Sequence, residues 1–215
     1  MKVIGVAGPI GAGKSSIVHA LKEDRALASN LGGAVLSIDA DAVLREARRS
    51  SLALQRAIAA LAPEAQREDG SLDSAKLATA AFARPELLRA LEALQWPIAR
   101  EAIGEARAAA DSSGAALLLV EAIALLESGL VESLDGVLLI DAPRDIRQAR
   151  LLERGMTAED FAQREAVQAG LRTRLLAAGA LPIDAGGSLA EGAAAAADAV
   201  RLLCSTGEAN ANPAD

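Results

Sequence analysis

The stretch Gly8-Pro9-Ile10-Gly11-Ala12-Gly13-Lys14-Ser15 fits the pattern G-x-x-x-x-G-K-[ST] at every fixed position. The apolar run from Lys2 to Ala7 comes directly before it and predicts a buried strand, and the residues from Ser16 to Lys22 predict a helix. A glycine loop between a strand and a helix is the context in which this pattern cradles phosphate groups, so we expect a nucleotide phosphate site. The alternative is a glycine-rich turn without a ligand, which the two flanking elements disfavour.

The residue types of this loop suit the chemistry of bound phosphates. Glycines let the backbone turn tightly and approach phosphate oxygens closely, and the loop N–H groups and the helix N-terminus attract the anion. Lys14 is expected to reach the β- and γ-phosphates, and the Ser15 hydroxyl to ligate Mg²⁺. The predicted nucleotide contacts in this part of the chain are Gly8, Ile10, Gly11, Ala12, Gly13, Lys14, Ser15 and Ser16.

Composition limits the class of protein. The 215 residues suffice for one domain with a small insertion, and 52% of them are hydrophobic while 1% are aromatic. The formal net charge of −7 offers no basic surface, so no nucleic-acid partner is expected. No apolar run reaches transmembrane length, and the first strand leaves no room for a signal peptide. Because Cys204 is the single cysteine, no disulfide can form within the chain, and we expect a cytoplasmic protein without membrane contact.

Short apolar runs alternate with amphipathic helical segments along most of the chain. This alternation predicts an α/β fold, a parallel sheet of the P-loop NTPase type with helices on both faces. Ligands of such sheets bind beyond the carboxyl ends of the strands. Beyond the first strand and its loop, strands are predicted at 34–38, 115–120, 136–140 and 181–184, and helices at 15–24, 42–49, 144–154, 158–178 and 189–203.

One long segment lacks any strand signal. Residues 52–111, punctuated by Pro63, Pro85 and Pro97, predict a helical insertion. The sheet-containing core is then expected to comprise residues 1–51 and 112–204. The polar residues 205–215 predict a disordered tail.

Acidic residues stand where predicted strands end. Asp39 and Asp41 follow the second strand as D-x-D, and in extended backbone both carboxylates point the same way. If the first two strands lie close together, one carboxylate would hold a metal-bound water and the other would meet an acceptor hydroxyl. Glu121 ends the third strand and would touch the metal through water. The alternatives are a helix N-cap at Asp41, a turn acid at Asp39 and a plain strand-end acid at Glu121.

Arginines gather between residues 144 and 168. Arg147, Arg150 and Arg154 share one face of a predicted helix at i, i+3 and i+7, and Arg164 follows after a turn. Arginines on both sides of a short flexible turn predict a lid over residues 144–168 that closes on phosphates and excludes water. The alternative is a solvated helix face whose arginines pair with nearby acids.

The single histidine and the few aromatic residues have ordinary structural interpretations. His19 is expected on the surface of the helix after the loop. Phe82, Trp96 and Phe161 make up all the aromatic residues, and core packing is the default expectation for each of them.

Taken in order from Lys2 to about Glu191, these residues resemble the dephospho-CoA kinase family. The loop is similar to the family's G-x-I-G-x-G-K-S/T, and Ile38-Asp39-Ala40-Asp41 followed by Arg45 is similar to its I-D-A-D segment. Asp69-Gly70-Ser71-Leu72-Asp73 resembles part of its helical acceptor domain, and residues 125–130 resemble its L-L-F-E-S-G-L region. The residues that fall on its lid pattern are Asp141, Gln148, Arg150, Arg154, Arg164 and Gln168. The chain departs from the family at Ser74, Trp96, Ile123 and Gly179, where the family has Arg, His, Pro and Asp.

The resemblance implies an enzyme that uses ATP and Mg²⁺ to phosphorylate the 3′-hydroxyl of dephospho-CoA, a small-molecule acceptor. It implies that the insertion binds this acceptor. By analogy, Asp41 is the base or positions the acceptor, Asp39 holds metal-bound water, and Lys14 and Arg150 stabilise the transferring phosphoryl group. The implied site comprises the catalytic residues Lys14, Asp39, Asp41 and Arg150, the metal residues Ser15, Asp39 and Glu121, the acceptor contacts Asp41, Arg45, Phe82 and Trp96, and Arg154 on the nucleotide.

Two alternatives stay open. The chain could be a P-loop kinase of another nucleotide or small metabolite, or a weakly catalytic nucleotide-binding paralogue. The intact Lys14 and D-x-D pair favour an enzyme over a binding module. A monomer or a weak homo-oligomer is expected.

Overall fold

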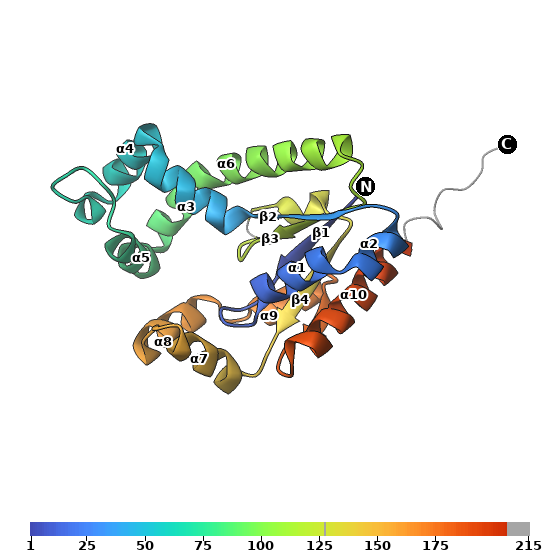
Figure 1. The fold of residues 1–215 in the computed structure, drawn as a ribbon. Coiled ribbons are helices and arrows are strands. Elements are labelled where there is room, and N and C mark those ends of the chain that lie inside the picture. Colours follow the sequence, from blue (N-terminus) through green and yellow to red (C-terminus); the bar gives the residue numbers. More distant parts are fainter. Residues whose placement is uncertain (127, 206–215) are drawn as a thin grey trace. The chain divides into compact units, whose positions relative to one another are not determined.

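The computed structural model describes residues 1–126 and 128–205, with the backbone alone at Phe82 (Figure 1). The chain divides into two compact units. One contains Met1–Ile38 and the chain from Ala106 onward, and the other is Asp39–Glu105. In the described part of the chain, no helix has both the length and the apolar character needed to cross a membrane.

Five parallel strands form one sheet within the described residues, in the order β2-β3-β1-β4-β5. The predicted α/β fold is therefore confirmed. Strand β3 lies between β1 and β2, so the first two strands of the chain are not neighbours. The strands are β1 Lys2–Ala7, β2 Val35–Asp39, β3 Leu117–Glu121, β4 Gly136–Asp141 and β5 Leu181–Asp184.

Both faces of the sheet are covered. Every residue from Val3 to Ala7 on β1 and from Leu117 to Glu121 on β3 is buried. Because successive side chains of a strand point to opposite faces, continuous burial requires helices on both sides. Helices α1, α2 and α10 pack against one another, and α9 packs against β4. The helices of this unit are α1 Lys14–Glu23, α2 Arg25–Leu31, α7 Arg144–Glu153, α8 Ala158–Val167, α9 Leu171–Ala177 and α10 Leu189–Ser205, with the 3-10 turn η2 Leu130–Ser133.

The helices of this unit differ from the sequence-based prediction in three places. The single helix expected over 158–178 is two helices, α8 and α9. Gly170, between them, adopts a left-handed φ of 75° that interrupts the helical backbone and places Gly170 as the N-cap of α9. The short helix α2 was not predicted. Helix α10 includes Ser205, the first residue of the predicted tail, and residues 206–215 lie outside the described part of the chain.

The second unit is helical and has its own core. It begins at Asp39 and ends at Glu105, whereas the sequence-based boundaries of the insertion are residues 52 and 111. Ile58, Ala62 and Ala65 are fully buried at the centre of this core. Its elements are α3 Ala40–Ser50, α4 Leu52–Leu61, the 3-10 turn η1 Pro63–Ala65, α5 Ser74–Ala83 and the part of α6 Pro85–Ser112 that ends at residue 105.

Pro97 lies inside α6, so the expectation that it marks an element boundary is wrong. A proline in a helix interior removes one backbone hydrogen bond and costs about 3 kcal/mol. The helix continues because Leu91, Gln95 and Ala99 are buried at helical spacing on one face, while Pro97 itself is exposed. Packing of the buried face outweighs the local penalty.

Candidate nucleotide-binding site

The loop between β1 and α1 has a backbone that requires glycine, as Gly8 and Gly13 show. Gly8 has a φ of 149°, and a Cβ there would collide with the carbonyl oxygen of Ile140 on β4. Gly13, the residue before α1, has a φ of 101°, a conformation that side chains rarely allow. The loop therefore lies flush against the carboxyl end of β4 and then turns sharply into the helix.

Lys14 is held against the backbone of its own loop. Its side chain is 8% exposed, and Nζ donates to the carbonyl oxygens of Gly8 at 3.0 Å and Pro9 at 3.3 Å. The side chain of Lys14, the first residue of α1, thus reaches back across the loop to Gly8, the first glycine of the loop. Nζ is therefore held within the loop that is predicted to bind phosphate groups.

Ser15 and Glu121, the two residues predicted to lie nearest a metal ion, are in direct contact. Ser15 Oγ donates to Glu121 Oε1 at 2.7 Å. Glu121 is buried at the end of β3 and pairs in register with Val6 of β1. Because β1 ends one residue later and leads into the loop, Glu121 lies beside the loop. Among the described residues, no three His, Cys, Asp or Glu side chains form a metal-binding group. An ion at Ser15 would therefore take most of its ligands from water and bound phosphate.

The 144–168 segment holds the loop through its backbone. Arg147 Nη1 donates to the Ile10 carbonyl oxygen at 3.2 Å, while the Ile10 N–H donates to Gln168 Oε1 at 2.8 Å. Arg150 Nη1 donates to the Ala12 carbonyl oxygen at 3.2 Å. Both polar groups of Ile10 are thus satisfied by side chains that lie more than 130 residues away in sequence.

Arg147 is itself held by a small network. Its side chain is 10% exposed, and Nη2 lies 2.7 Å from Glu165 Oε1, while Arg144 Nε donates to the other oxygen of the same carboxylate at 2.6 Å. Burial raises the pKa of Glu165, but hydrogen bonds from the two arginines outweigh it and hold that pKa below its usual range. Both guanidinium groups lie over Phe161, at 5.2 and 5.7 Å from the ring centre. Phe161 is fully buried, which confirms its predicted place in the core.

A cavity of about 160 Å³ opens beside the loop. It brings together Ser16 of α1 and Arg150 and Arg154 of the 144–168 segment, and their contact with a nucleotide stays a prediction. Part of its wall comes from the turn between β5 and α10, including Ala185, whose carbonyl oxygen accepts from Arg150 Nη2 at 2.7 Å.

The D-x-D segment is not extended, and this expectation is wrong. Asp39 ends β2, whereas Asp41 already lies in the first turn of α3. Asp39 Oδ1 accepts from the N–H of Ala42 at 2.9 Å, so Asp39 is the N-cap that the sequence interpretation considered for Asp41. The helix begins at Ala40 because the capping carboxylate at the strand end satisfies one of its first free N–H groups, that of Ala42.

The predicted acceptor residues belong to the helical unit. Arg45 is exposed on α3, with Nη2 3.7 Å from Asp39 Oδ2. Trp96 is half-buried on α6. Phe82 lies on α5, and its side chain is outside the described part of the structure. His19 is exposed on α1, as predicted.

The contacts of Ile10 were not foreseen. The arginine pattern placed Arg147 on a lid, and Gln168 entered only as part of a family pattern. Neither assignment indicated that these side chains bind the loop backbone. The signal that could have found them is long-range, because it is the pairing of two distant polar side chains with the N–H and C=O groups of a half-buried loop residue.

Comparison with known proteins shows the relationship of the whole chain. The dephospho-CoA kinase family model matches residues 2–191. The dephospho-CoA kinase of Corynebacterium jeikeium is 37% identical over 182 residues, which cover 83% of this chain and 88% of that protein. The dephospho-CoA kinase of Corynebacterium glutamicum is 34% identical over 191 residues, 88% of this chain and 93% of that protein.

Solved structures agree with this relationship. The crystal structure of TT1252 from Thermus thermophilus is 30% identical with a TM-score of 0.73, covering 94% of this chain and 96% of that one. Dephospho-CoA kinase from Campylobacter jejuni has a TM-score of 0.60 at 22% identity, covering 96% and 100% of the two chains, and supports the fold. With the loop, the lysine and the serine–glutamate pair in place, this chain belongs to the dephospho-CoA kinase family.

Proposed function

We propose that this protein transfers the γ-phosphoryl group of ATP to the 3′-hydroxyl of dephospho-CoA, giving coenzyme A and ADP. The observation that carries the proposal is the family match over residues 2–191 together with an intact phosphate loop. The acceptor oxygen forms a bond to the γ-phosphorus while the bond to the bridging oxygen of ADP breaks. The hydroxyl proton passes to a carboxylate, for which we propose Asp41.

The loop is the proposed site of the ATP phosphates. Its N–H groups and the N-terminus of α1 supply positive potential, and Lys14 adds a full charge. These groups stabilise the charge on the transferring phosphoryl group, which is the main catalytic requirement of such a reaction. The cavity beside the loop is the proposed place of the nucleoside, with Arg154 at its rim.

Mg²⁺ is the proposed metal. The residues fit a hard cation, because Ser15 Oγ and Glu121 Oε1 are oxygen donors 2.7 Å apart beside the loop. When bound, Mg²⁺ neutralises charge on the β- and γ-phosphates. We propose that Ser15 holds the ion directly, and that Glu121 and Asp39 hold its water ligands.

Arg150 is the proposed lid cation. Its guanidinium already joins the loop at Ala12 to the β5–α10 turn at Ala185. A planar group with several donors can exchange one of these carbonyl contacts for a phosphate oxygen without leaving the site. The segment 144–168 would then respond to nucleotide through Arg150 and Arg147 together.

The acceptor is proposed to bind the helical unit, where Arg45, Phe82 and Trp96 stay predicted contacts. We also propose a cytoplasmic location, where ATP is available to the reaction. A monomer or weak homo-oligomer stays a prediction from the sequence.

The proposal is tested by measuring ATP consumption with dephospho-CoA and, in parallel, with shikimate, gluconate and nucleoside monophosphates. We expect turnover with dephospho-CoA and a product that carries the new phosphate on the 3′-oxygen. The Lys14→Ala variant, purified in the same way, controls for contaminating kinases. Turnover with another acceptor and none with dephospho-CoA would show that this chain has changed its substrate.

A further inference from the structure

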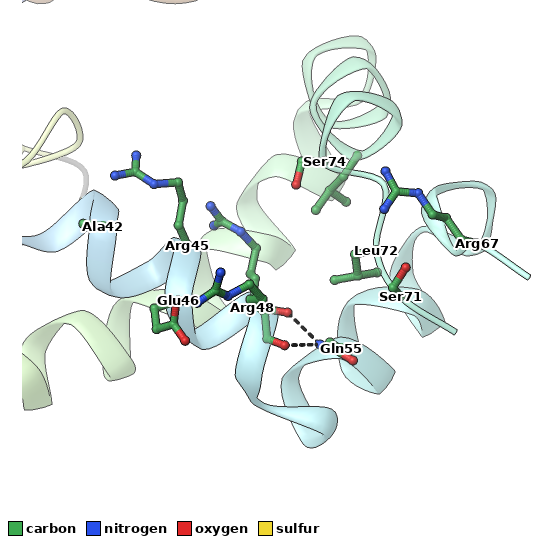
Figure 2. Close-up of a pocket in the computed structure, with 11 residues that line it drawn as sticks. Ala42, Arg45, Glu46, Arg48, Gln55, Arg67, Ser71, Leu72 and Ser74 are labelled. Atoms are coloured by element: carbon green, nitrogen blue, oxygen red, sulfur yellow. Dashed lines mark hydrogen bonds and ion pairs between the residues drawn. The ribbon is translucent and has the colours of Figure 1, made fainter. Parts of the chain in front are cut away.

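The helical unit contains a pocket of about 510 Å³ whose lining is rich in arginine (Figure 2). Arg45, Arg48 and Arg49 come from α3, and Arg67 comes from the loop before α5. Figure 2 shows Arg45 and Arg48 on one side of the pocket and Arg67 with Leu72 on the other. Glu46 is the single carboxylate of the lining. In a chain with a net charge of −7, this is a local concentration of positive charge.

Arg48 is the most informative member of this arginine pocket. Its Nη1 donates to the neutral side-chain oxygen of Gln95, and it forms no ion pair with any residue that the structure describes. Burial lowers the pKa of Arg48, and the positive charge of Arg45 lowers it further, although Asp41 raises it. A half-buried cation without an ion-pair partner is costly, and an anion in the pocket would offset that cost.

Two other guanidinium groups of the pocket have carboxylates only at longer distances among the residues that the structure describes. Arg67 Nη2 lies 3.5 Å from Asp73 Oδ2, and Arg45 Nη2 lies 3.7 Å from Asp39 Oδ2. A direct charge-assisted hydrogen bond is shorter, about 2.7–2.9 Å. Arg49, in contrast, is paired with Glu46 at 2.9 Å. Arg45, Arg48 and Arg67 therefore keep donors for a ligand.

The walls of the pocket are held in place by hydrogen bonds. Gln55 Nε2 donates to the carbonyl oxygens of Arg48 and Arg49 at 3.0 and 2.8 Å, which ties α4 to the end of α3. On the other side, Asp73 caps α5 by accepting from the N–H groups of Ala75 and Lys76. The arginines thus project from a preorganised frame, which reduces the entropy lost when a ligand binds.

We propose that the arginine pocket binds the diphosphate of the acceptor, dephospho-CoA. The inference rests on the proposed function and assigns a chemical task to one site within it. A diphosphate ester carries two negative charges on adjacent groups, and guanidinium forks bind such oxygens bidentately. The pocket is larger than a diphosphate, so it has room for part of the groups attached to it. The acceptor would then be selected by its diphosphate as well as by its ribose.

The test is steady-state kinetics of Arg48→Gln and Arg67→Gln in the full chain. Each variant should raise the KM for dephospho-CoA about 10- to 100-fold, the usual effect of removing a hydrogen bond to a charged group. The KM for ATP and kcat should change little. Arg48→Lys, which keeps the charge and loses the planar fork, should fall between wild type and Arg48→Gln. Arg56→Gln is the matched control, because Arg56 is exposed on neighbouring α4 and lies outside the pocket lining.

Several outcomes would overturn the inference without affecting the proposed function. If wild type phosphorylates dephospho-CoA and both folded variants keep its KM, the pocket does not hold the diphosphate. If Arg48→Gln does not fold, Arg67→Gln decides alone.

If dephospho-CoA is not phosphorylated at all, the proposed function fails. In that case, calorimetric titration of inorganic pyrophosphate, with a non-hydrolysable ATP analogue saturating the loop, decides about the pocket. Weaker binding to Arg67→Gln than to wild type supports an anion site, and equal binding rejects it.

Discussion

The side-chain oxygen of Gln168 accepts a hydrogen bond from the backbone N–H of Ile10 at 2.8 Å, across 158 positions of the sequence. Ile10 lies in the middle of the phosphate loop, and its carbonyl oxygen is bound by Arg147. The two peptide groups on either side of the Ile10 Cα are thus each held by a side chain and cannot rotate freely, so the direction of the neighbouring N–H groups is set before a nucleotide arrives. Preorganised dipoles of this kind bind charge without a later cost of reorientation.

Gln168→Ala should raise the KM for ATP about 2- to 10-fold, because the net worth of one such hydrogen bond is about 0.5–1.5 kcal/mol. The effect on the KM for dephospho-CoA should be smaller. Gln163→Ala is the matched control, since Gln163 is an exposed glutamine on α8. A lower KM for ATP in Gln168→Ala would mean that Gln168 competes with phosphate for the Ile10 N–H.

Lys14→Ala should reduce kcat by about 10²-fold or more, because the transferring phosphoryl group loses a full positive charge. The loop also loses the contacts of Nζ with Gly8 and Pro9, so ATP binding should weaken as well. Stopped-flow or steady-state ATP consumption measures the rate, and calorimetry measures binding. Lys22→Ala, at the exposed end of α1, should be neutral. Near-normal turnover by Lys14→Ala would remove the loop from the catalytic site.

Asp41→Asn should lower kcat much more than it raises the KM for ATP, since the amide keeps the size of the side chain but cannot take a proton. Asp39→Asn should instead change the Mg²⁺ dependence. Asparagine caps a helix about as well as aspartate, so α3 should stay folded in this variant. Asp39→Ala removes the cap and should cost about 1 kcal/mol of stability in addition. A larger kcat loss in Asp39→Asn at unchanged Mg²⁺ dependence would exchange the two roles.

The sequence predicted the local parts of the site well. The strand, the loop and α1 are specified by neighbouring residues, and Gly8 and Gly13 are required where the pattern places them. Glu121 lies beside Ser15 of the loop, as its place at a strand end predicts, because strand ends of a parallel sheet meet at one edge. The metal roles of these two residues stay predictions.

Features that depend on packing could not be predicted in this way. Whether Asp39 or Asp41 caps α3 depends on the residue at which β2 ends, and sheet pairing decides that. Pro97 reads as a helix breaker, yet burial on the opposite face of α6 keeps the helix intact. The contacts of Ile10 depend on how α7 and α8 pack, and no short pattern encodes them.

Glu165→Gln should lower the Tm at pH 7, because the ion pairs with Arg144 and Arg147 are lost. The pKa of Glu165 is lower in the folded protein than the ordinary value of about 4.3. The carboxylate therefore contributes stability above about pH 4.3, and this contribution is lost as the pH falls through the lowered pKa. The Tm difference between wild type and Glu165→Gln should shrink as the pH falls below about 4.3. Glu153→Gln, an exposed glutamate on α7, serves as the control. A difference that stays constant across this range would show that the carboxylate charge does not stabilise the fold.

Trp96 offers a direct optical test of where the acceptor binds. It is the single tryptophan of the chain, and it follows Gln95, whose side-chain oxygen accepts from Arg48 in the arginine pocket. An anion at Arg48 would alter the field and the hydrogen bonds around this part of α6, so dephospho-CoA should shift the indole emission. ATP alone should have much less effect, because its proposed site lies in the other unit.

The same fluorescence titration, repeated with variants, tests the role of Arg48 separately from the location of the acceptor. In Arg48→Gln, the Trp96 response should need a dephospho-CoA concentration about 10- to 100-fold higher, in step with the loss of a charged hydrogen bond. Trp96→Phe should abolish the signal while leaving turnover measurable, which assigns the emission change to this residue. A flat Trp96 signal with dephospho-CoA, combined with no calorimetric binding up to millimolar concentration, would place the acceptor outside the helical unit or identify a different acceptor. A normal response in Arg48→Gln would keep the acceptor in this unit but move its diphosphate away from Arg48.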